Sequence, residues 1–235
     1  SHTQEPPLQP AEPWSVRERL ALEKTAIGFY LSGHLFDECE AEVRQFCPRK
    51  VADLIDSREP QLLAGIVTDL RVVNGQRGRV AIFKLDDCSE PIEAVANEEL
   101  LDKHREWLRD DELLVVQGKV QPDRFSGGLR LNVNQVWDLA SARARFGRHL
   151  AVDIGDGLPP VAELVQAHPA RVEKADEGEL VQGLPVRLRL QRPGASAELD
   201  LGAAGRIWPS DEALARWRKL ALAGRARIVY GAAER

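Results

Sequence analysis

The stretch from Leu113 to Val136, LLVVQGKVQPDRFSGGLRLNVNQV, joins two aliphatic segments through a short glycine-rich loop. The first segment, Leu113 to Val120, and the second, Leu129 to Val136, are rich in valine and leucine, as β-strands are. The residues between them, 121–128, contain the proline, aspartate and paired glycines of a turn. In the second segment leucine and valine alternate with arginine and asparagine, so the pattern predicts a hairpin with one buried face.

The sequence before this hairpin predicts three more strands and one helix. The strands are Leu62 to Val73, Arg79 to Leu85 and Pro91 to Ala96, and Asn97 can cap the helix that follows. Three strands, a helix and two strands is the order of an OB-fold, a five-stranded Greek-key barrel. An internal glycine, Gly65, suits the first strand, because that strand must bend to join both halves of the barrel.

The remaining sequence divides the chain into four parts. Residues 1–13 are a proline-rich linker, and residues 14–60 have the spacing of a helical hairpin that leads into the barrel. Residues 61–148 form the OB-fold domain, and residues 149–235 form a small α/β domain whose last helix is capped by Ser210. We therefore expect an α+β, β-rich fold with a helical hairpin, a five-stranded barrel and a C-terminal α/β domain.

The composition is that of a globular protein without a membrane partner. Of 235 residues 43% are hydrophobic and 29% are charged, and the formal net charge is −5. No apolar run approaches the roughly 18 residues of a membrane span. The three cysteines, Cys39, Cys47 and Cys88, lack a Cys-x-x-Cys spacing, which favours reduced thiols in a cytoplasmic protein. Because the sequence starts at Ser1 and contains no methionine, we expect it to be a piece of a longer protein.

Basic residues gather in two stretches of the predicted barrel. Residues 70–85 contain four basic residues and no acidic one, and residues 113–148 contain six basic against two acidic residues. Guanidinium groups neutralise phosphates and an exposed aromatic ring stacks on a base, so a barrel that joins these stretches would offer a groove for single-stranded DNA. The alternative is an ordinary solvated face, and Phe83, on a strand, is expected in the core. The candidate nucleic-acid-binding residues are Arg71, Arg77, Arg79, Lys84, Lys119, Arg124, Phe125, Arg130 and Asn132.

No catalytic or metal-binding constellation is recognisable in the sequence. The glycine-rich nucleotide-binding motifs and the G-x-S-x-G nucleophile motif are absent. The adjacent carboxylates of Asp86-Asp87 and of residues 110–112 have no partner at a known metal-site spacing. We therefore expect no catalytic residue, no metal and no cofactor in this chain.

Several strings resemble the alpha subunit of bacterial DNA polymerase III. EKTAIGFYLSGH at residues 23–34 resembles the segment just before the OB domain of that family. LDDCS at residues 85–89 and DRFSGGL at residues 123–129 resemble landmarks of the OB domain itself. Pro209-Ser210-Asp211, with the helix that follows it, resembles the family's C-terminal domain, so the resemblance covers nearly the whole chain.

The resemblance implies a division of labour between the two domains. The OB domain would bind the single-stranded template, and the C-terminal domain would dock the tau subunit of the clamp loader. The polymerase carboxylates and the sliding-clamp peptide would lie upstream, in the rest of the alpha subunit, so this chain alone would not be an enzyme although its parent would be a DNA-directed DNA polymerase. The alternative hypothesis is a pure protein-interaction module of the replisome without DNA contact. The candidate partner-binding residues are Arg187, Arg189, Trp208, Asp211, Leu214 and Trp217.

Overall fold

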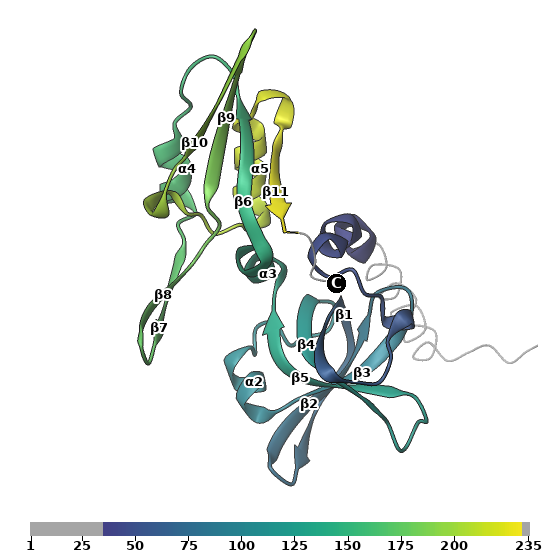
Figure 1. The fold of residues 1–235 in the computed structure, drawn as a ribbon. Helices are drawn as coiled ribbons and strands as arrows, with labels where there is room; N and C mark the ends of the chain where they lie inside the picture. Colours follow the sequence, from purple (N-terminus) through teal and green to yellow (C-terminus); the bar gives the residue numbers. More distant parts are fainter. Residues whose placement is uncertain (1–34, 232–235) are drawn as a thin grey trace, which may run out of the picture.

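The computed structural model describes residues 35–231, in which a β-barrel and a second, sheet-based unit are connected through a central helix (Figure 1). The barrel strands are β1 (Ser57–Gly75), β2 (Gly78–Asp86), β3 (Pro91–Ala96), β4 (Leu113–Pro122) and β5 (Leu129–Trp137), and α2 (Glu98–Lys103) lies between β3 and β4. A helix precedes the barrel and a small α/β unit follows it, which confirms the predicted α+β, β-rich fold class. None of the helices in this part of the chain is long and apolar enough to cross a membrane.

The barrel closes in the order β1-β2-β3-β5-β4, with β3 and β5 parallel and the other neighbours antiparallel. The long strand β1 closes it, because its first half pairs with β4 and its second half pairs with β2. Where β1 changes partner, a Cβ on Gly65 would lie 2.7 Å from the carbonyl oxygen of Asp86. A side chain does not fit there, which explains the glycine that the sequence places in this strand. The strand begins at Ser57, earlier than the predicted start at Leu62.

The interior of the barrel is filled by the alternating aliphatic residues of its strands. Phe83, Leu85 and Leu131 are among the fully buried side chains of this core. The barrel also receives Leu101 of α2, whose N-terminus is capped as predicted: the Asn97 side chain accepts a hydrogen bond from the backbone N–H of Leu100. The two hairpins and the helix predicted between them are therefore confirmed.

Residues 35–46 form a helix that packs on the outside of the barrel. Phe36, Val43 and Phe46 are buried there against β1 and β4. These residues belong to the second helix of the predicted hairpin. The first helix of that hairpin lies outside the described residues, and residues 57–60, which the prediction assigned to the hairpin, belong to β1.

The buried carboxylate of Asp87 fixes this helix to the barrel. It accepts hydrogen bonds from the guanidinium of Arg44 at 2.9 Å and from the backbone N–H of Val51 at 2.9 Å. Burial raises the pKa of the Asp87 carboxyl, but the hydrogen bonds from Ser89, Val51 and Arg44 outweigh it and hold the pKa below its usual value. The LDDCS string is therefore an architectural motif that joins β2 to the segment before the barrel.

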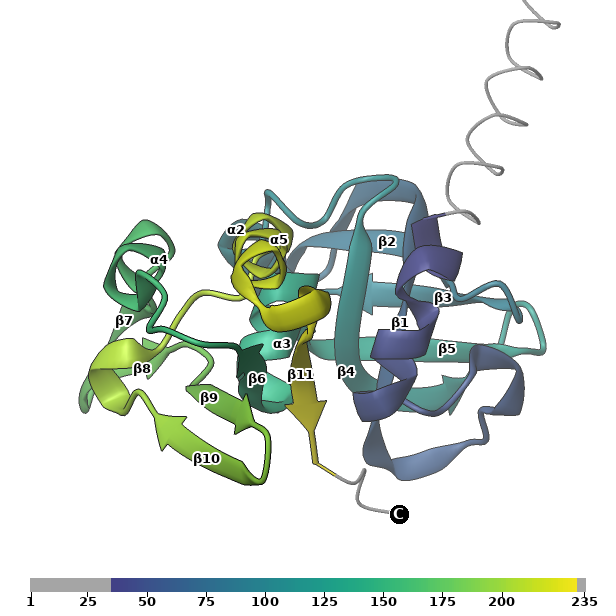
Figure 2. The same ribbon diagram turned by 90° about the horizontal axis from the view of Figure 1, so that it is seen from above.

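The second unit is a four-stranded sheet in the order β10-β9-β6-β11, and Figure 2 shows its two helices, α4 and α5, on the same face. Leu150, Leu188 and Trp217 are buried between the sheet and these helices. The Ser210 hydroxyl accepts a hydrogen bond from the Ala213 N–H, which is the predicted cap of α5. The elements are β6 (Gly147–Ile154), α4 (Val161–Ala167), β9 (Val186–Arg192), β10 (Ala195–Asp200), α5 (Asp211–Leu220) and β11 (Ala226–Tyr230).

Two elements of this region were not predicted from the sequence. The first is α3 (Leu139–Phe146), which connects the barrel to β6. The second is a hairpin formed by β7 (Arg171–Ala175) and β8 (Gly178–Gln182), which pair only with each other. Every residue of this hairpin is exposed except Gln182, which is half-buried, so the hairpin has no core of its own.

A buried arginine on α3 joins the three parts of the molecule. The side chain of Arg143 is only 5% exposed and donates hydrogen bonds to Glu42 at 2.7 and 3.0 Å, to Asp211 at 2.7 Å and to the carbonyl oxygen of Pro209 at 3.2 Å. The hydroxyl of Tyr230 donates to the same Glu42 carboxylate at 2.7 Å. Burial raises the pKa of Glu42, but the hydrogen bonds and charge of Arg143 outweigh it, so the net pKa is below its usual value. The helix of residues 35–46, α3, which follows the last barrel strand, and the C-terminal unit thus meet at one ion-pair cluster.

Candidate nucleic-acid interface

One outward face of the barrel gathers side chains from β1, β2, β3, β5 and β4. The strand register aligns Lys84 with Glu93 and Glu93 with Arg130, so these three residues form a row across β2, β3 and β5. Paired residues on neighbouring strands point to the same face of a sheet. The adjacent row consists, in strand order, of Arg71, Ile82, Val95, Asn132 and Lys119. The structure therefore brings Arg71, Lys84 and Arg130 of the predicted set together around Glu93, and Asn132 and Lys119 follow in the adjacent row on β5 and β4.

Carboxylates neutralise part of the positive charge on this face. Glu93 lies between two arginines, 2.5 Å from Arg130 and 3.9 Å from Arg71, and Asp69 lies 3.4 Å from Lys84. All five side chains are at least partly exposed, so these ion pairs are screened by water and each contributes little to stability. The face is therefore a cationic surface with its own anionic counterparts.

The two predicted binding loops extend from the ends of this face. Arg77 lies in the two-residue turn between β1 and β2, and Arg124 and Phe125 lie in the β4–β5 loop. Figure 1 shows both hairpin ends on the side of the barrel that points away from the C-terminal unit. The side chain of Phe125 is 97% exposed, and Arg77 and Arg124 have no carboxylate partner among residues 35–231. These three residues are available to a ligand without any rearrangement.

Asp123 gives the β4–β5 loop a defined shape. Its carboxylate accepts hydrogen bonds from the backbone N–H of Phe125 at 3.1 Å and from the hydroxyl of Ser126 at 2.8 Å. These hydrogen bonds, that of Phe125 first, hold the pKa of Asp123 below its usual value. Gly127 has φ of 73°, a backbone conformation that favours glycine. The DRFSGGL string therefore builds a turn that presents the Phe125 ring to solvent.

The expected position of Arg79 is corrected by the structure. Arg79 alternates with the outward residues of β2 and points the other way, over the end of the barrel onto α2. Its guanidinium donates to Glu98 at 3.0 Å and to Asp102 at 2.9 Å. The sequence prediction missed this because strand alternation places Arg79 on the core side, and only a helix beyond the barrel end could receive its charge. Arg79 is therefore a contact between β2 and α2 rather than part of the cationic face.

Three of the candidate partner-binding residues lie in the core of the C-terminal unit. Leu214 and Trp217 are fully buried beneath the sheet, and the ring of Trp208 is covered by the guanidinium of Arg171 at 4.1 Å. All three side chains are therefore covered: Leu214 and Trp217 because α5 turns its apolar side inward, and Trp208, which precedes α5, because Arg171 lies over its ring. Their role in the described structure is packing.

The other three candidates are exposed to different degrees. Arg187 and Arg189 point outward from β9, where they pair with Asp200 at 2.9 Å and with Asp153 at 3.0 Å. Asp211 begins α5 and holds Arg143 while its side chain stays 84% exposed. The structure therefore leaves an arginine-bearing sheet face and the start of α5 as the available parts of the predicted docking surface.

Glu93 lies at the centre of the cationic face, and the sequence prediction did not single it out. The signal was present, because alternation in β3 turns Glu93 and Val95 outward when Ile92, Ala94 and Ala96 point inward. What the sequence lacked was the register that places Glu93 beside Arg130 on a strand 37 positions later. Among the residues that the structure describes, no group of three His, Cys, Asp or Glu side chains is arranged to hold a metal ion.

A family model gives the same assignment for the barrel. Residues 62–139 match a family model described as an OB-fold nucleic acid binding domain. Among solved structures, the second OB-fold domain of replication protein A from Methanococcus maripaludis aligns with 39% of this chain and 93% of its own length, at 16% identity and a TM-score of 0.32.

The sequence relatives are considerably longer proteins. DNA polymerase III subunit alpha of Vibrio cholerae is 35% identical over 210 residues, which cover 88% of this chain and 18% of the relative. The same subunit of Neisseria meningitidis serogroup A is 39% identical over 163 residues, which cover 66% of this chain and 14% of the relative. That of Escherichia coli K12 is 32% identical over 207 residues, which cover 86% of this chain and 17% of the relative. This chain thus spans less than a fifth of the length of the relatives it matches. The chain belongs to the DNA polymerase III alpha subunit family, as the counterpart of one segment that contains the OB-fold domain.

Proposed function

We propose that this chain is a non-catalytic part of a replicative DNA polymerase alpha subunit, in which the barrel binds single-stranded template DNA. The proposal also holds that the C-terminal unit docks the tau subunit of the clamp loader. It places the chain in a cytoplasmic replisome, beside the rest of the alpha subunit. The relatives named DNA polymerase III subunit alpha and the nucleic-acid-binding family model support the first part. The polymerase chemistry belongs to other parts of such a subunit.

The observation that carries the DNA proposal is the alignment of the cationic face with a fully exposed aromatic ring. Arg71, Lys119 and Arg130 lie on the outward face of the barrel, and Arg124 and Phe125 lie at its edge. Cations along a groove hold a phosphate backbone, and an aromatic ring at the surface stacks on an unpaired base. Because every base has a flat face, this arrangement favours binding without strong sequence preference.

The salt dependence of binding tests this proposal. A fluorescently labelled single strand should bind the full chain with an affinity that falls as salt rises, measured by anisotropy at several salt concentrations. Arg77→Gln and Arg124→Gln should each reduce the slope of log affinity against log salt by about 0.7, because each removes one phosphate contact. Arg79→Gln is the matched control: it removes a charge from the same hairpin as Arg77 but from the side that contacts α2, and should leave the slope unchanged.

Absence of binding at low salt would contradict the DNA proposal altogether. An equal loss of slope in the Arg79→Gln variant would show instead that the interaction is not confined to the cationic face.

A pure protein-interaction module is the second candidate function, and the ion pairs of Glu93 and Asp69 favour it. They neutralise Arg130, Arg71 and Lys84 within the molecule, as expected of a surface that has no phosphate to bind. If this function is correct, anisotropy will detect no single-strand binding while the tau interaction persists.

The tau proposal rests on the sheet face that carries Arg187 and Arg189. Arg187→Glu should weaken retention of the full chain by immobilised tau about tenfold. A partner surface that attracts an arginine is negatively charged, and it would repel the glutamate that replaces Arg187. Arg192→Glu is the matched control, since Arg192 ends the same strand and pairs with Asp156 away from that face. Equal retention of both variants would exclude the β9 face as the docking surface, and unfolding curves identify any variant that loses its fold.

A further inference from the structure

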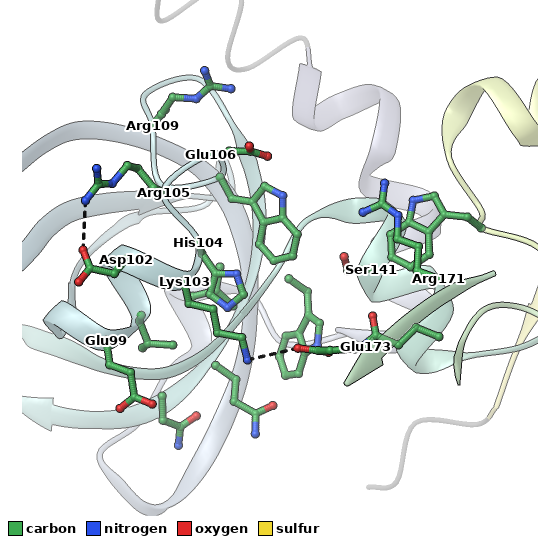
Figure 3. A pocket seen from close by; sticks show the side chains of 18 of the residues that line it. Glu99, Asp102, Lys103, His104, Arg105, Glu106, Arg109, Ser141, Arg171 and Glu173 are labelled. Atoms are coloured by element: carbon green, nitrogen blue, oxygen red, sulfur yellow. Dashed lines mark hydrogen bonds and ion pairs between the residues drawn. The ribbon is translucent and has the colours of Figure 1, made fainter. Parts of the chain in front are cut away.

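A cavity with a volume of about 1170 Å³ lies between the barrel and the β7–β8 hairpin. One wall consists of α2 and the turn after it, and the other consists of β7 and the start of α3 (Figure 3). Trp107 stacks on His104 on the first wall, with ring centroids 4.6 Å apart, while Arg171 lies over the ring of Trp208 on the second wall. Trp137, at the end of β5, lines the cavity between the two walls. We call this cavity the interdomain cleft.

A smaller cavity of about 210 Å³ adjoins the cleft at the hairpin. Trp137, Ser141 and Gln182 line both cavities, so the two are neighbours at the end of β8. The smaller cavity adds Leu180 and the aliphatic part of the α3 surface at Ala144. Together they form a passage that is long and partly apolar, a shape that suits an extended chain more than a small molecule.

Among the described strands, the two strands of the hairpin that covers this passage pair only with each other. Val172, Leu180 and Val181 of this hairpin are between 45% and 57% exposed. A two-stranded hairpin without a packed face is only marginally stable. A single ion pair, Lys103 with Glu173 at 3.9 Å, links it across the cleft to α2. Material in the cleft would bury these apolar side chains and supply the missing packing.

Charge is distributed unevenly along the passage. The smaller cavity is lined by Arg145 and Arg206 and by no carboxylate, and the Nε of Arg206 is buried without a hydrogen-bond partner among the described residues. The hairpin beside the larger cavity carries four acidic residues against two basic ones, Arg171 and Lys174, and three of the acidic residues, Asp176, Glu177 and Glu179, lie around its turn, outside the lining of either cavity. An acidic hairpin repels a phosphate backbone, so the passage is suited to a polypeptide rather than to DNA.

We propose that the interdomain cleft binds an extended polypeptide segment of a partner protein, with apolar side chains in its middle, an acidic end at Arg145 and Arg206 and a basic end at the acidic hairpin. Its apolar side chains lie against Trp107, Trp137 and Leu180. Aromatic and arginine side chains are the residues that most often dominate binding at protein interfaces. The proposal is separate from the DNA proposal, whose two hairpin loops lie on the side of the barrel that points away from the C-terminal unit (Figure 1).

Synthetic peptides of defined charge test the polarity of the site. The probe is a fluorescein-labelled nine-residue peptide with Glu-Glu at one end, alternating Leu and Phe around a central Pro, and Lys-Lys at the other end. Two comparison peptides carry Lys-Lys or Glu-Glu at both ends. The full chain should bind the mixed peptide at least about tenfold more tightly than either comparison peptide, since a lost charge-assisted hydrogen bond is worth about 1.4 kcal/mol or more.

A charge exchange then identifies the residues involved. The double variant Arg145→Glu, Arg206→Glu should lose at least about tenfold in affinity for the mixed peptide and should bind the peptide with lysines at both ends more tightly than the unaltered chain does. Leu180→Asp should weaken the mixed peptide about tenfold without altering this preference. Arg227→Glu, on β11 and remote from the cleft, is the control and should change neither affinity.

Three results would overturn the proposal. The first is no saturable binding of the mixed peptide, and the second is binding that the Arg145 and Arg206 exchange leaves unchanged. The third is displacement of the peptide by single-stranded DNA, which would assign the cleft to nucleic acid. The indole N–H resonances of Trp107 and Trp137 should shift on peptide addition, and thermal unfolding of each variant confirms that a loss of binding is not a loss of fold.

Discussion

Arg143→Met should lower the free energy of unfolding by about 3–5 kcal/mol, the usual cost of leaving one partner of a buried ion pair without its counter-charge. The side chain of Arg143 fills the space between α3 and two other elements, and four of its hydrogen bonds end on Glu42, Asp211 and Pro209. Methionine retains much of the volume but leaves the Glu42 carboxylate half-buried beside Tyr230. Urea denaturation, followed by far-UV circular dichroism, measures the change.

The neighbouring Arg145 provides the matched control for this result. It lies on the same helix and is exposed, with its guanidinium over the ring of Phe146, so Arg145→Met should change stability by no more than about 0.5 kcal/mol. Adding Glu42→Gln to the Arg143→Met variant should recover part of the loss, because the unpaired charge is then removed. Equal effects of the two arginine substitutions would contradict the view that the ion-pair cluster holds the units together.

Phe83→Ala should also destabilise the chain by about 3–5 kcal/mol, because it leaves a cavity in the middle of the barrel. Phe83 is 1% exposed and packs with Leu85 and Leu131. Loss of this ring should lower the midpoint of denaturation while the single-strand affinity of the remaining folded protein stays unchanged. The combination of a denaturation curve and an anisotropy titration separates the two effects.

Phe125→Ala should give the opposite pattern. The ring contacts solvent, so stability should change by no more than about 0.5 kcal/mol. Affinity for a labelled single strand should fall roughly fivefold to 150-fold, because one base loses a stacking platform worth about 1–3 kcal/mol. Unchanged affinity would remove Phe125 from the proposed DNA interface, and a large loss of stability would contradict its exposed position.

The elements that could be predicted from sequence are those whose signals are local. The barrel strands follow from alternating side chains, and the starts of α2 and α5 follow from Asn97 and Ser210, which cap them through their own side chains. The β7–β8 hairpin carries no such signal, because it buries neither face and therefore needs no alternation. Side-chain alternation arises when one face of a strand is buried, so it cannot predict a strand pair that buries neither face.

The candidate site was predictable in composition but not in its pairings. The cationic face could be assembled from the residues because β2, β4 and β5 each turn every second side chain outward. The ion pairs could not, since they depend on which strands become neighbours, as with Arg130 and Glu93 or Arg79 and α2. Arg143 resembles any basic residue near a helix end in the sequence, and only the packing of three separate segments around it makes it central.

Glu93 has a consequence for how the proposed interface would handle a moving template. Any phosphate that reaches Arg71 or Arg130 must first displace this carboxylate, and the carboxylate returns as soon as the phosphate departs. Because the Glu93 carboxylate competes with phosphate for the same arginines, each phosphate contact would be brief while the attraction remains. A single-stranded template could then move along the barrel without being held at one position.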